Sequence, residues 1–226
     1  MLSGIVHALQ SGGRWGDCPP VYGPKKTLYS RFVRWAERGI WESIFSSLAG
    51  AEDIPDRLFI DSTCIKAHRT AGGAKACAEL GRSGGGLANG IGQTRGGRNS
   101  KLHAICDVKG RPCVLLITPG NVHDMKVAEQ CIAAMPPSAE LVGDNGYDSS
   151  DLRGWLAERG TTAVIPSKRN RKIQLQCDAQ IYKQRNVVER MFCRIKDWRR
   201  VATGFDRNIK TFMATIAIAA IVIWWL

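Results

Sequence analysis

The sequence of 226 residues predicts an α/β fold, in which a β-sheet is flanked by helices. Short runs rich in apolar and β-branched residues occur at 58–68 and 139–144, and such runs are typical of strands. Segments with apolar residues at helical spacing follow, at 149–159 and 182–196. Strands that are followed by helices along a chain indicate a sheet covered by helices.

Length and charge restrict the organisation of the chain and the class of its partner. We expect a small helical region at 1–50 and one larger domain at 55–226, with a Gly-rich loop at about 70–100. The chain holds 32 Lys and Arg against 20 Asp and Glu, a formal net charge of +12. Residues 166–200 alone carry 11 basic and 3 acidic side chains. This concentration of positive charge favours a polyanionic partner.

Cysteine spacing and the two ends of the chain predict a reduced cytoplasmic protein. The eight cysteines show neither zinc-like nor C-x-x-C spacing. The first ten residues lack the basic start and cleavage site of a signal peptide. Residues 212–226 are uncharged but shorter than the roughly 20 residues that span a bilayer, so we expect a buried helix against the sheet and no membrane contact.

The first 50 residues are predicted to be helical, at 1–10, 27–38 and 40–48. Gly39 separates the last two helices, and several arginines lie among their polar positions. Two interpretations fit this pattern. It is either a helix-turn-helix that enters a DNA groove, or a packed helical hairpin with solvated arginines.

The strand predicted at 58–68 contains an acid within an apolar run. The alternation of a strand places Asp61, Thr63 and Ile65 on the same face. A carboxylate inside a buried strand is costly unless it is paired or holds a cation. Asp61 is therefore either a metal ligand or a satisfied structural residue.

The Gly-rich stretch at 70–100 is expected to be a linker, although its interspersed cations also suit contact with a nucleic-acid backbone. Two short apolar runs, at 102–107 and 112–118, then predict a β-hairpin. His123 starts a helix that runs to about Ala134, either near a site or as a structural residue.

A second acid, Asp144, ends the strand at 139–144 and precedes a glycine turn. Open α/β sheets place functional groups at the carboxyl ends of their strands, so Asp144 is a candidate for a functional site. A helix at 149–159 and a last strand at 161–166 follow, and the chain then enters a basic segment.

The segment 182–196 is predicted to be one helix with two different faces. At 3.6 residues per turn, one arc of about 60° carries a phenol, two cations and a carboxylate: Tyr182, Arg185, Glu189 and Lys196. The opposite face carries an apolar stripe for a core: Val187, Val188, Met191 and Ile195. The polar face is either solvated surface or part of a site.

Three carboxylates near basic charge suit metal-assisted attack on a phosphodiester. Asp61, Asp144 and Glu189 supply the oxygen ligands that Mg²⁺ prefers, and two such ions activate the attacking hydroxyl and stabilise the leaving oxygen. Mn²⁺ is the expected substitute. Lys and Arg around them would hold DNA phosphates.

At these residues the sequence resembles the DDE transposases of bacterial insertion sequences, in particular the insertion-sequence-five group of the insertion-sequence-four-like superfamily. The spacing Tyr, two residues, Arg, three residues, Glu, six residues, Lys matches the family signature at Tyr182, Arg185, Glu189 and Lys196. Further similarity lies in IDSTCIKAHRTAGG, TRGGRNSKLHAICD, PGNVHD and GDNGYDS, and it runs through essentially the whole chain.

The resemblance implies an RNase H-like mixed five-stranded sheet flanked by helices, with Asp61, Asp144 and Glu189 as catalytic metal ligands. It also implies cleavage at terminal inverted repeats and strand transfer into target DNA, by a homodimer on paired ends, near the nucleoid. The expected DNA contacts are Tyr182, Arg185, Lys196, Arg190, Arg199, Arg200, Lys168 and Arg169. Family members carry a few dozen residues before the equivalent of Met1, so a shortened, non-catalytic DNA-binding remnant or regulator of transposition is the alternative.

Overall fold

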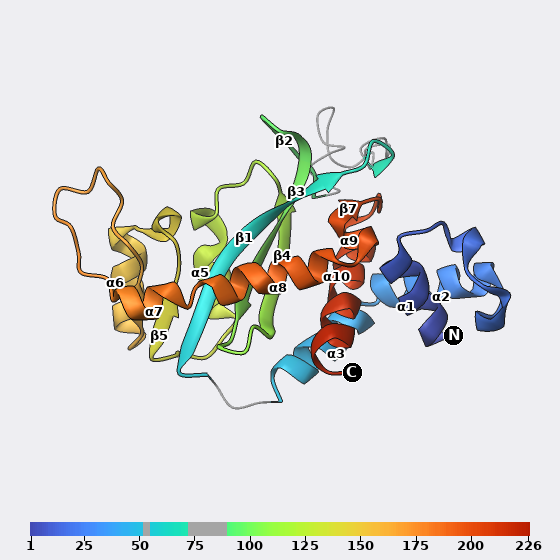
Figure 1. Ribbon diagram of the computed structural model, residues 1–226, viewed down its shortest axis with the longest axis horizontal. Helices are drawn as coiled ribbons and strands as arrows, with labels where there is room; N and C mark the ends of the chain where they lie inside the picture. Colours follow the sequence, from blue (N-terminus) through green and yellow to red (C-terminus); the bar gives the residue numbers. More distant parts are fainter. Residues whose placement is uncertain (52–54, 72–89) are drawn as a thin grey trace.

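The protein is built around a mixed β-sheet, shown in Figure 1, a computed structural model that describes residues 1–51, 55–71 and 90–226. The central strand β1 (Arg57–Ala67) pairs antiparallel with β3 (Gly97–Cys106) and parallel with β5 (Glu140–Val142). On the outer sides, β4 (Pro112–Pro119) pairs with β3, and β6 (Thr162–Val164) pairs with β5. The predicted mixed sheet is confirmed, with core order β4-β3-β1-β5-β6.

Two short strands extend the sheet from the expected five strands to seven among the described residues. β2 (Gly92–Thr94) forms a hairpin with the start of β3, and β7 (Thr203–Gly204) pairs with the far end of β1. Both form because β1 and β3 are long enough to extend past their other partners and leave backbone groups free for pairing. The linker expected at 70–100 therefore does not include 92–99, and residues 72–89 lie outside the described part of the chain.

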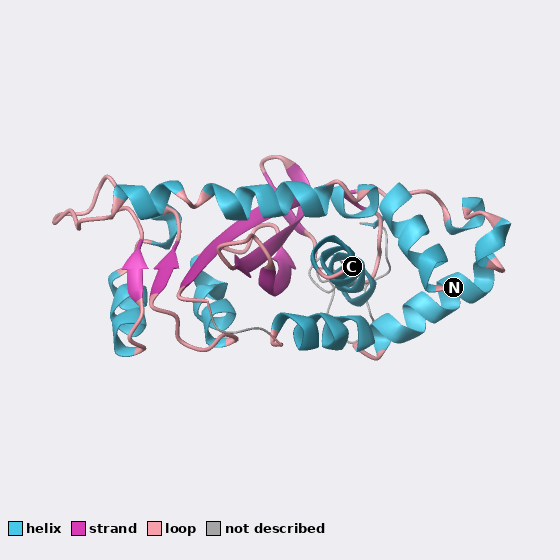
Figure 2. Ribbon diagram, turned by 60° about the horizontal axis from the view of Figure 1, so that its bottom comes forward, coloured by secondary structure: helices cyan, strands magenta, loops and turns pink. Residues whose placement is uncertain are grey.

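Helices cover both faces of the sheet (Figure 2). One face is covered by α7 (Ala179–Lys183) and α8 (Asn186–Lys196), the other by α5 (Met125–Ala133) and α6 (Ser150–Glu158). Side chains of β1 alternate between two apolar clusters: Phe59 and Ile65 join the cluster under α8, while Leu58 and Ile60 join the cluster under α5 and α6. Asp61 shares the α8 face with Phe59 and Ile65, as predicted.

The single helix predicted at 182–196 is instead two helices, α7 and α8. Between them the backbone winds more tightly, since Gln184 and Arg185 donate to Ile181 and Tyr182, each three residues back. The apolar stripe is confirmed, because all four of its side chains are buried in the core. The tight turn directs the guanidinium of Arg185 toward β1, where it contacts Asp61.

The N-terminal helices share one apolar core with the sheet and with α8 and α10 (Ile209–Trp224). α1 (Leu2–Ser11), α2 (Lys25–Glu37) and α3 (Ile40–Ala49) pack against α10. Gly39 has φ +66° and makes the sharp turn between α2 and α3. The described part of the chain contains no helix long and apolar enough to cross a membrane, and α10 is largely buried. Both interpretations of these helices, the helix-turn-helix and the packed hairpin, stay predictions.

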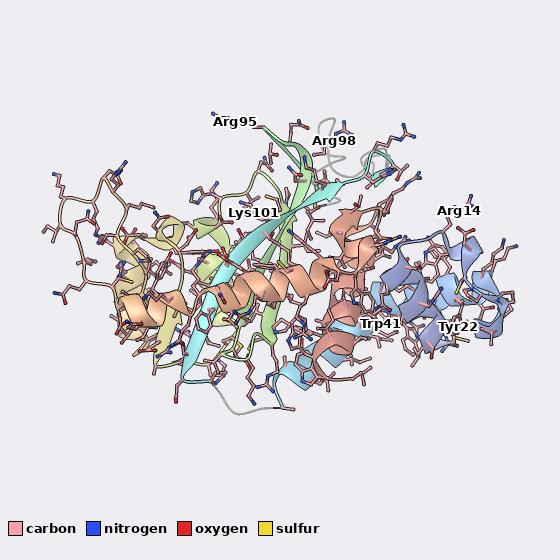
Figure 3. The ribbon with its side chains drawn as sticks, in the orientation of Figure 1. Arg14, Tyr22, Trp41, Arg95, Arg98 and Lys101 are labelled. Carbon is pink, nitrogen blue, oxygen red and sulfur yellow. The ribbon has the colours of Figure 1, made fainter. Side chains whose placement is uncertain are left out.

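The remaining elements are short. Among the described residues, 3₁₀ turns lie at Trp15–Asp17, Pro20–Tyr22 and Asn145–Tyr147, and a one-turn helix α9 (Arg199–Ala202) follows α8. The hairpin of β2 and β3 carries Arg95 and Arg98 at its outer end, with Lys101 further along β3 toward the centre of the sheet (Figure 3).

Candidate active site

Three separate elements bring Asp61, Asp144 and Glu189 to the same region. Asp61 lies in β1, and Asp144 lies two residues beyond the end of β5. The parallel register pairs Phe59 with Val142, so Asp61 and Asp144 each follow that pair by two residues and lie at the same level. Glu189 is in the first turn of α8, the helix that packs on this face of β1. Strand register thus places Asp61 and Asp144 at the same level of the sheet.

Arg185 bridges two of these acids. Its Nη2 donates to Asp61 Oδ2 and its Nη1 to Glu189 Oε1, both at 2.7 Å. The side chains of Arg185 and Asp61 are 17% and 14% exposed, while Glu189 is 56% exposed. The guanidinium therefore occupies the space between a buried carboxylate and an accessible one.

The pKa of Asp61 is raised, mainly because its carboxyl group is buried. Burial is the largest cause and raises this pKa to about 6, and the charges of Asp144 and Glu189 act in the same direction. Arg185 and the backbone N–H of Ser62 oppose the shift. Burial alone would lower the pKa of Arg185, but Asp61 and Asp144 raise it, so its guanidinium stays charged.

Asp144 is oriented by the turn that follows it. Its Oδ1 accepts a hydrogen bond of 2.8 Å from the N–H of Gly146 and so caps the 3₁₀ turn. One carboxylate oxygen is thereby fixed by the backbone. The GDNGYDS motif thus places a carboxylate at the end of β5 in a defined orientation.

The donor set suits a hard divalent cation, because carboxylate oxygens are the ligands that Mg²⁺ takes. Besides burial, the negative charges of Asp144 and Glu189 raise the pKa of Asp61, and a bound cation would oppose this effect. Among the described residues, no three acidic, His or Cys side chains are close enough to hold a metal ion together. The three carboxylates are suitable ligands for a divalent cation. Arg185, which pairs with Asp61 and Glu189, occupies the space between these two acids.

Lys196 contacts β1 beside the acids. Its Nζ donates to Thr63 Oγ1 at 2.6 Å and to the carbonyl of Cys64 at 3.2 Å. Partial burial lowers its pKa. Tyr182 packs on the edge of the core cluster under α8. The four residues of the helix signature therefore border one site on β1.

The other predicted DNA contacts differ in accessibility. Arg190, Arg199 and Arg169 are exposed, and Lys168 is half-buried. Arg200 is 11% exposed, pairs with Asp206 at 3.1 Å and lies over the Trp15 ring at 5.7 Å. Arg200 thus ties the N-terminal region to the segment after α9, and a role in DNA contact stays a prediction for all of these residues.

Sequence reasoning missed a polar network on the opposite face of β1. Asp124 Oδ1 accepts from Ser62 Oγ at 2.8 Å and lies 3.1 Å from the Nζ of Lys101. His103 lies 3.6 Å from the same oxygen and exchanges a hydrogen bond of 2.8 Å with Thr118. This network fixes Ser62, the neighbour of Asp61. The acid in the PGNVHD motif was the feature of the sequence that could have indicated this network. The pairing of Ser62 with His103, however, depends on a strand register that the sequence does not reveal.

The buried imidazole of His103 makes a test of acid stability possible. Burial, the largest cause, lowers its pKa to about 4 from 6.5, and Asp124 at 3.6 Å does not overcome this, so the ring is neutral at neutral pH. In the unfolded chain His103 takes up a proton below pH 6.5. The free energy of unfolding should therefore fall by about 3 kcal/mol between pH 6.5 and 4 through this residue.

Urea denaturation across that pH range measures this loss. His103→Gln should remove most of the difference, whereas the matched change at exposed His123, His123→Gln, should leave it unchanged. Equal pH dependence in both variants would contradict the assignment.

A second buried acid, Asp148, anchors the basic segment after β6. Its side chain is 1% exposed and accepts from Arg153 Nε at 2.9 Å, Arg171 Nη1 at 2.8 Å and the Lys168 N–H at 2.8 Å. Burial would raise its pKa, but the Lys168 amide and the two arginines lower it. Asp148 therefore holds the segment 167–172, which contains two predicted DNA contacts, against α6.

Asp148→Asn should loosen this segment by about 3 kcal/mol, because it leaves two partly buried arginines without their anion. Trypsin should then cleave after residues 168–172 at least about tenfold faster, since cleavage follows the population of the open form. Asp151→Asn, at an exposed acid on α6, is the control. Unchanged cleavage of Asp148→Asn would show that the segment is held by other contacts.

Comparison with known proteins identifies the family. Residues 53–224 match the family described as transposase DDE domain, and residues 1–45 match the family described as putative transposase of the IS4/5 family. The putative transposase for insertion sequence element IS6501 of Brucella ovis is 29% identical over 126 residues, which cover 55% of this chain and 97% of the relative. The corresponding IS402 protein of Burkholderia cepacia is 30% identical over 137 residues, 56% of this chain and 63% of the relative.

A solved structure has the same fold. The chain resembles the piggyBac transposase in a synaptic complex with hairpin DNA, with a TM-score of 0.52 and 14% identity, over 83% of this chain and 50% of that chain. This likeness concerns the fold alone. Because the matched residues 53–224 make up most of the sequence, the chain belongs to the transposase DDE domain family, which confirms the predicted family and its class of function, DNA transposition.

Proposed function

We propose that this chain cleaves DNA at the terminal inverted repeats of an insertion sequence and joins the freed 3′ ends to target DNA. The observation that carries the proposal is that Asp61 in β1, Asp144 after β5 and Glu189 in α8 lie near enough for the charges of Asp144 and Glu189 to act on Asp61. In the first step water attacks the scissile phosphodiester and frees a 3′-hydroxyl. In the second step that hydroxyl attacks a phosphodiester of the target, forms a new P–O bond and displaces the 3′-oxygen of the target strand, which leaves as a hydroxyl.

The proposed metal ligands are Asp61, Asp144 and Glu189, which would hold two Mg²⁺ ions or Mn²⁺ as a substitute. Bound divalent metal supplies activation of the attacking oxygen and stabilisation of the leaving oxygen. For the acids to converge fully, Arg185 releases Glu189 and turns toward a DNA phosphate, whose charge replaces that of the carboxylate. Lys196, held beside Thr63, would contact the backbone next to the scissile bond.

The proposed partner is double-stranded DNA, both the transposon ends and the target. The net charge of +12 and the basic segment 166–200 support this partner. The solved relative was determined as a synaptic complex with hairpin DNA, and a homodimer on paired ends is the corresponding proposal here. We propose that residues 1–50 contribute to DNA binding and that 55–226 carry the chemistry.

The decisive experiment is strand cleavage of a labelled inverted-repeat duplex by the full chain with Mg²⁺. Cleavage that requires divalent metal and is lost in Glu189→Gln, but not in the matched surface variant Glu129→Gln, supports the proposal. Glu129 is an exposed acid on α5, on the other face of the sheet. Binding of the duplex without any cleavage by the wild-type chain would favour the alternative of a non-catalytic DNA-binding remnant.

A further inference from the structure

The outer side of α8 carries cations that the three acids do not engage. At about 100° per residue, Arg190 and Arg194 project about 100° and 140° away from Glu189 around the helix axis. Both are exposed, as is Lys109 in the turn between β3 and β4. Together with Trp224 at the end of α10, they line a hollow of about 290 Å³, which we call the Arg190 hollow.

The turn that presents Lys109 is held rigidly. The carboxylate of Asp107, 3% exposed, accepts hydrogen bonds of 2.8 Å from the N–H groups of Lys109 and Arg111. Gly110 has φ +76°, and a Cβ at this position would lie 3.2 Å from Val187 of α8. The turn is thus seated directly on α8, so Lys109 keeps its place beside the arginines.

Arg190 and Arg194 are held in place by contacts with uncharged groups, so their positive charge is not neutralised within the protein. The guanidinium of Arg194 lies 4.7 Å above the Trp224 ring and donates to the carbonyl of Ile223 at 3.2 Å. Arg190 donates to the neutral amide oxygen of Asn186. A guanidinium has five N–H donors, so each arginine keeps donors for an external acceptor.

The hollow has the chemistry of an anion site. No carboxylate lines it among the described residues, and the ion pairs found in that part of the chain include neither arginine nor Lys109. On the active-site side, in contrast, Arg185 and Lys196 already hold partners within the protein. The cations most available to DNA on α8 are therefore those of the Arg190 hollow.

We propose that the Arg190 hollow binds a backbone phosphate of the DNA whose scissile phosphate lies at Asp61, Asp144 and Glu189. This inference rests on the proposed transposase function and adds a second contact to it, on the other side of α8. A helix with its side chains is about 10 Å across, and B-DNA rises about 3.4 Å per base pair. The contacted phosphate is then about three base pairs from the scissile bond.

The test is binding of a fluorescent inverted-repeat duplex by the full chain in EDTA, so that cleavage plays no part. The double variant Arg190→Gln, Arg194→Gln should bind about tenfold more weakly or worse. The slope of log affinity against log salt should fall by about 2, because two phosphate contacts are lost.

The chain offers a matched control in Arg159, which lies 4.8 Å over the Trp155 ring and donates to the Met135 carbonyl at 2.8 Å. Arg159→Gln combined with Lys126→Gln removes the same charge on the α5 and α6 side of the sheet, and at Arg159 it removes the same kinds of contact that Arg194 makes. We expect this control to bind DNA like the wild type. Equal affinity and salt slope in both double variants would overturn the inference.

A second measurement locates the contact on the DNA. One neutral methylphosphonate about three base pairs from the cleavage position should weaken binding by the wild type but not by the Arg190, Arg194 double variant. A wild type that is insensitive to every such position would overturn the inference alone. A wild type that binds no repeat DNA at all would overturn the proposed function together with it.

Discussion

Replacing Asp61 by Asn should abolish strand cleavage, with a loss of at least about 10³-fold in rate. Asp61 is the most central of the three acids: it lies inside β1, is 14% exposed and contacts Arg185 at 2.7 Å. Asn keeps the size of the side chain and an oxygen acceptor for the Ser62 N–H, but it removes the negative charge that a divalent cation needs.

The assay is Mg²⁺-dependent cleavage of an inverted-repeat duplex, accompanied by the melting temperature of each variant. Asp56→Asn is the matched control, because Asp56 is exposed and precedes the same strand. We expect both variants to melt within a few degrees of the wild type, since the buried charge of Asp61 is itself disfavoured, as its raised pKa shows. Cleavage by Asp61→Asn at more than a tenth of the wild-type rate would exclude Asp61 as a metal ligand.

Replacing Phe32 by Ala should destabilise the whole protein by about 3 to 5 kcal/mol. Phe32 lies in α2, is fully buried and belongs to the same apolar cluster as Met191 of α8 and Ile216 of α10. Because this cluster is continuous, a cavity in the N-terminal helices should lower the stability of the β-sheet as well.

Chemical denaturation followed by two probes shows whether the N-terminal helices and the sheet unfold together or separately. Far-UV circular dichroism reports all helices, and protection of Cys106, buried in β3, from thiol labelling reports the sheet. Both transitions should shift together in Phe32→Ala. Tyr29→Ala, at a half-exposed aromatic on the same helix, should have a much smaller effect. A shift in helix signal without a shift in Cys106 protection would show that residues 1–50 unfold as a separate unit.

The sequence predicted those features that depend on local pattern. Strand alternation placed Asp61 on the face shared with Ile65, and helical spacing placed Val188 and Ile195 in the core. Patterns of this kind are set by the burial of one face of an element, which the residue order alone records. Asp144 was predicted as a candidate for a similar reason, because it ends an apolar strand and precedes a glycine turn.

Features that depend on three-dimensional partners were not predictable. The ion pair between Arg185 and Asp61 joins residues 124 positions apart, and it forms because a tight turn before α8 directs the guanidinium toward β1. The network around Asp124 depends on the register between β1 and β3. The short strands β2 and β7 arise from free backbone groups at the ends of longer strands, which no side-chain pattern reveals.

On the proposed function, uptake of a divalent ion would displace the guanidinium of Arg185, so that one cation would be exchanged for another. Within the protein, Asp61 and Glu189 share Arg185 as their counter-charge. Metal affinity without DNA is then reduced by the cost of breaking two ion pairs. A DNA phosphate that takes over the guanidinium removes this cost, and by thermodynamic reciprocity metal strengthens DNA binding by the same factor. Such coupling would confine a reactive, metal-loaded centre to the time when DNA is bound to it.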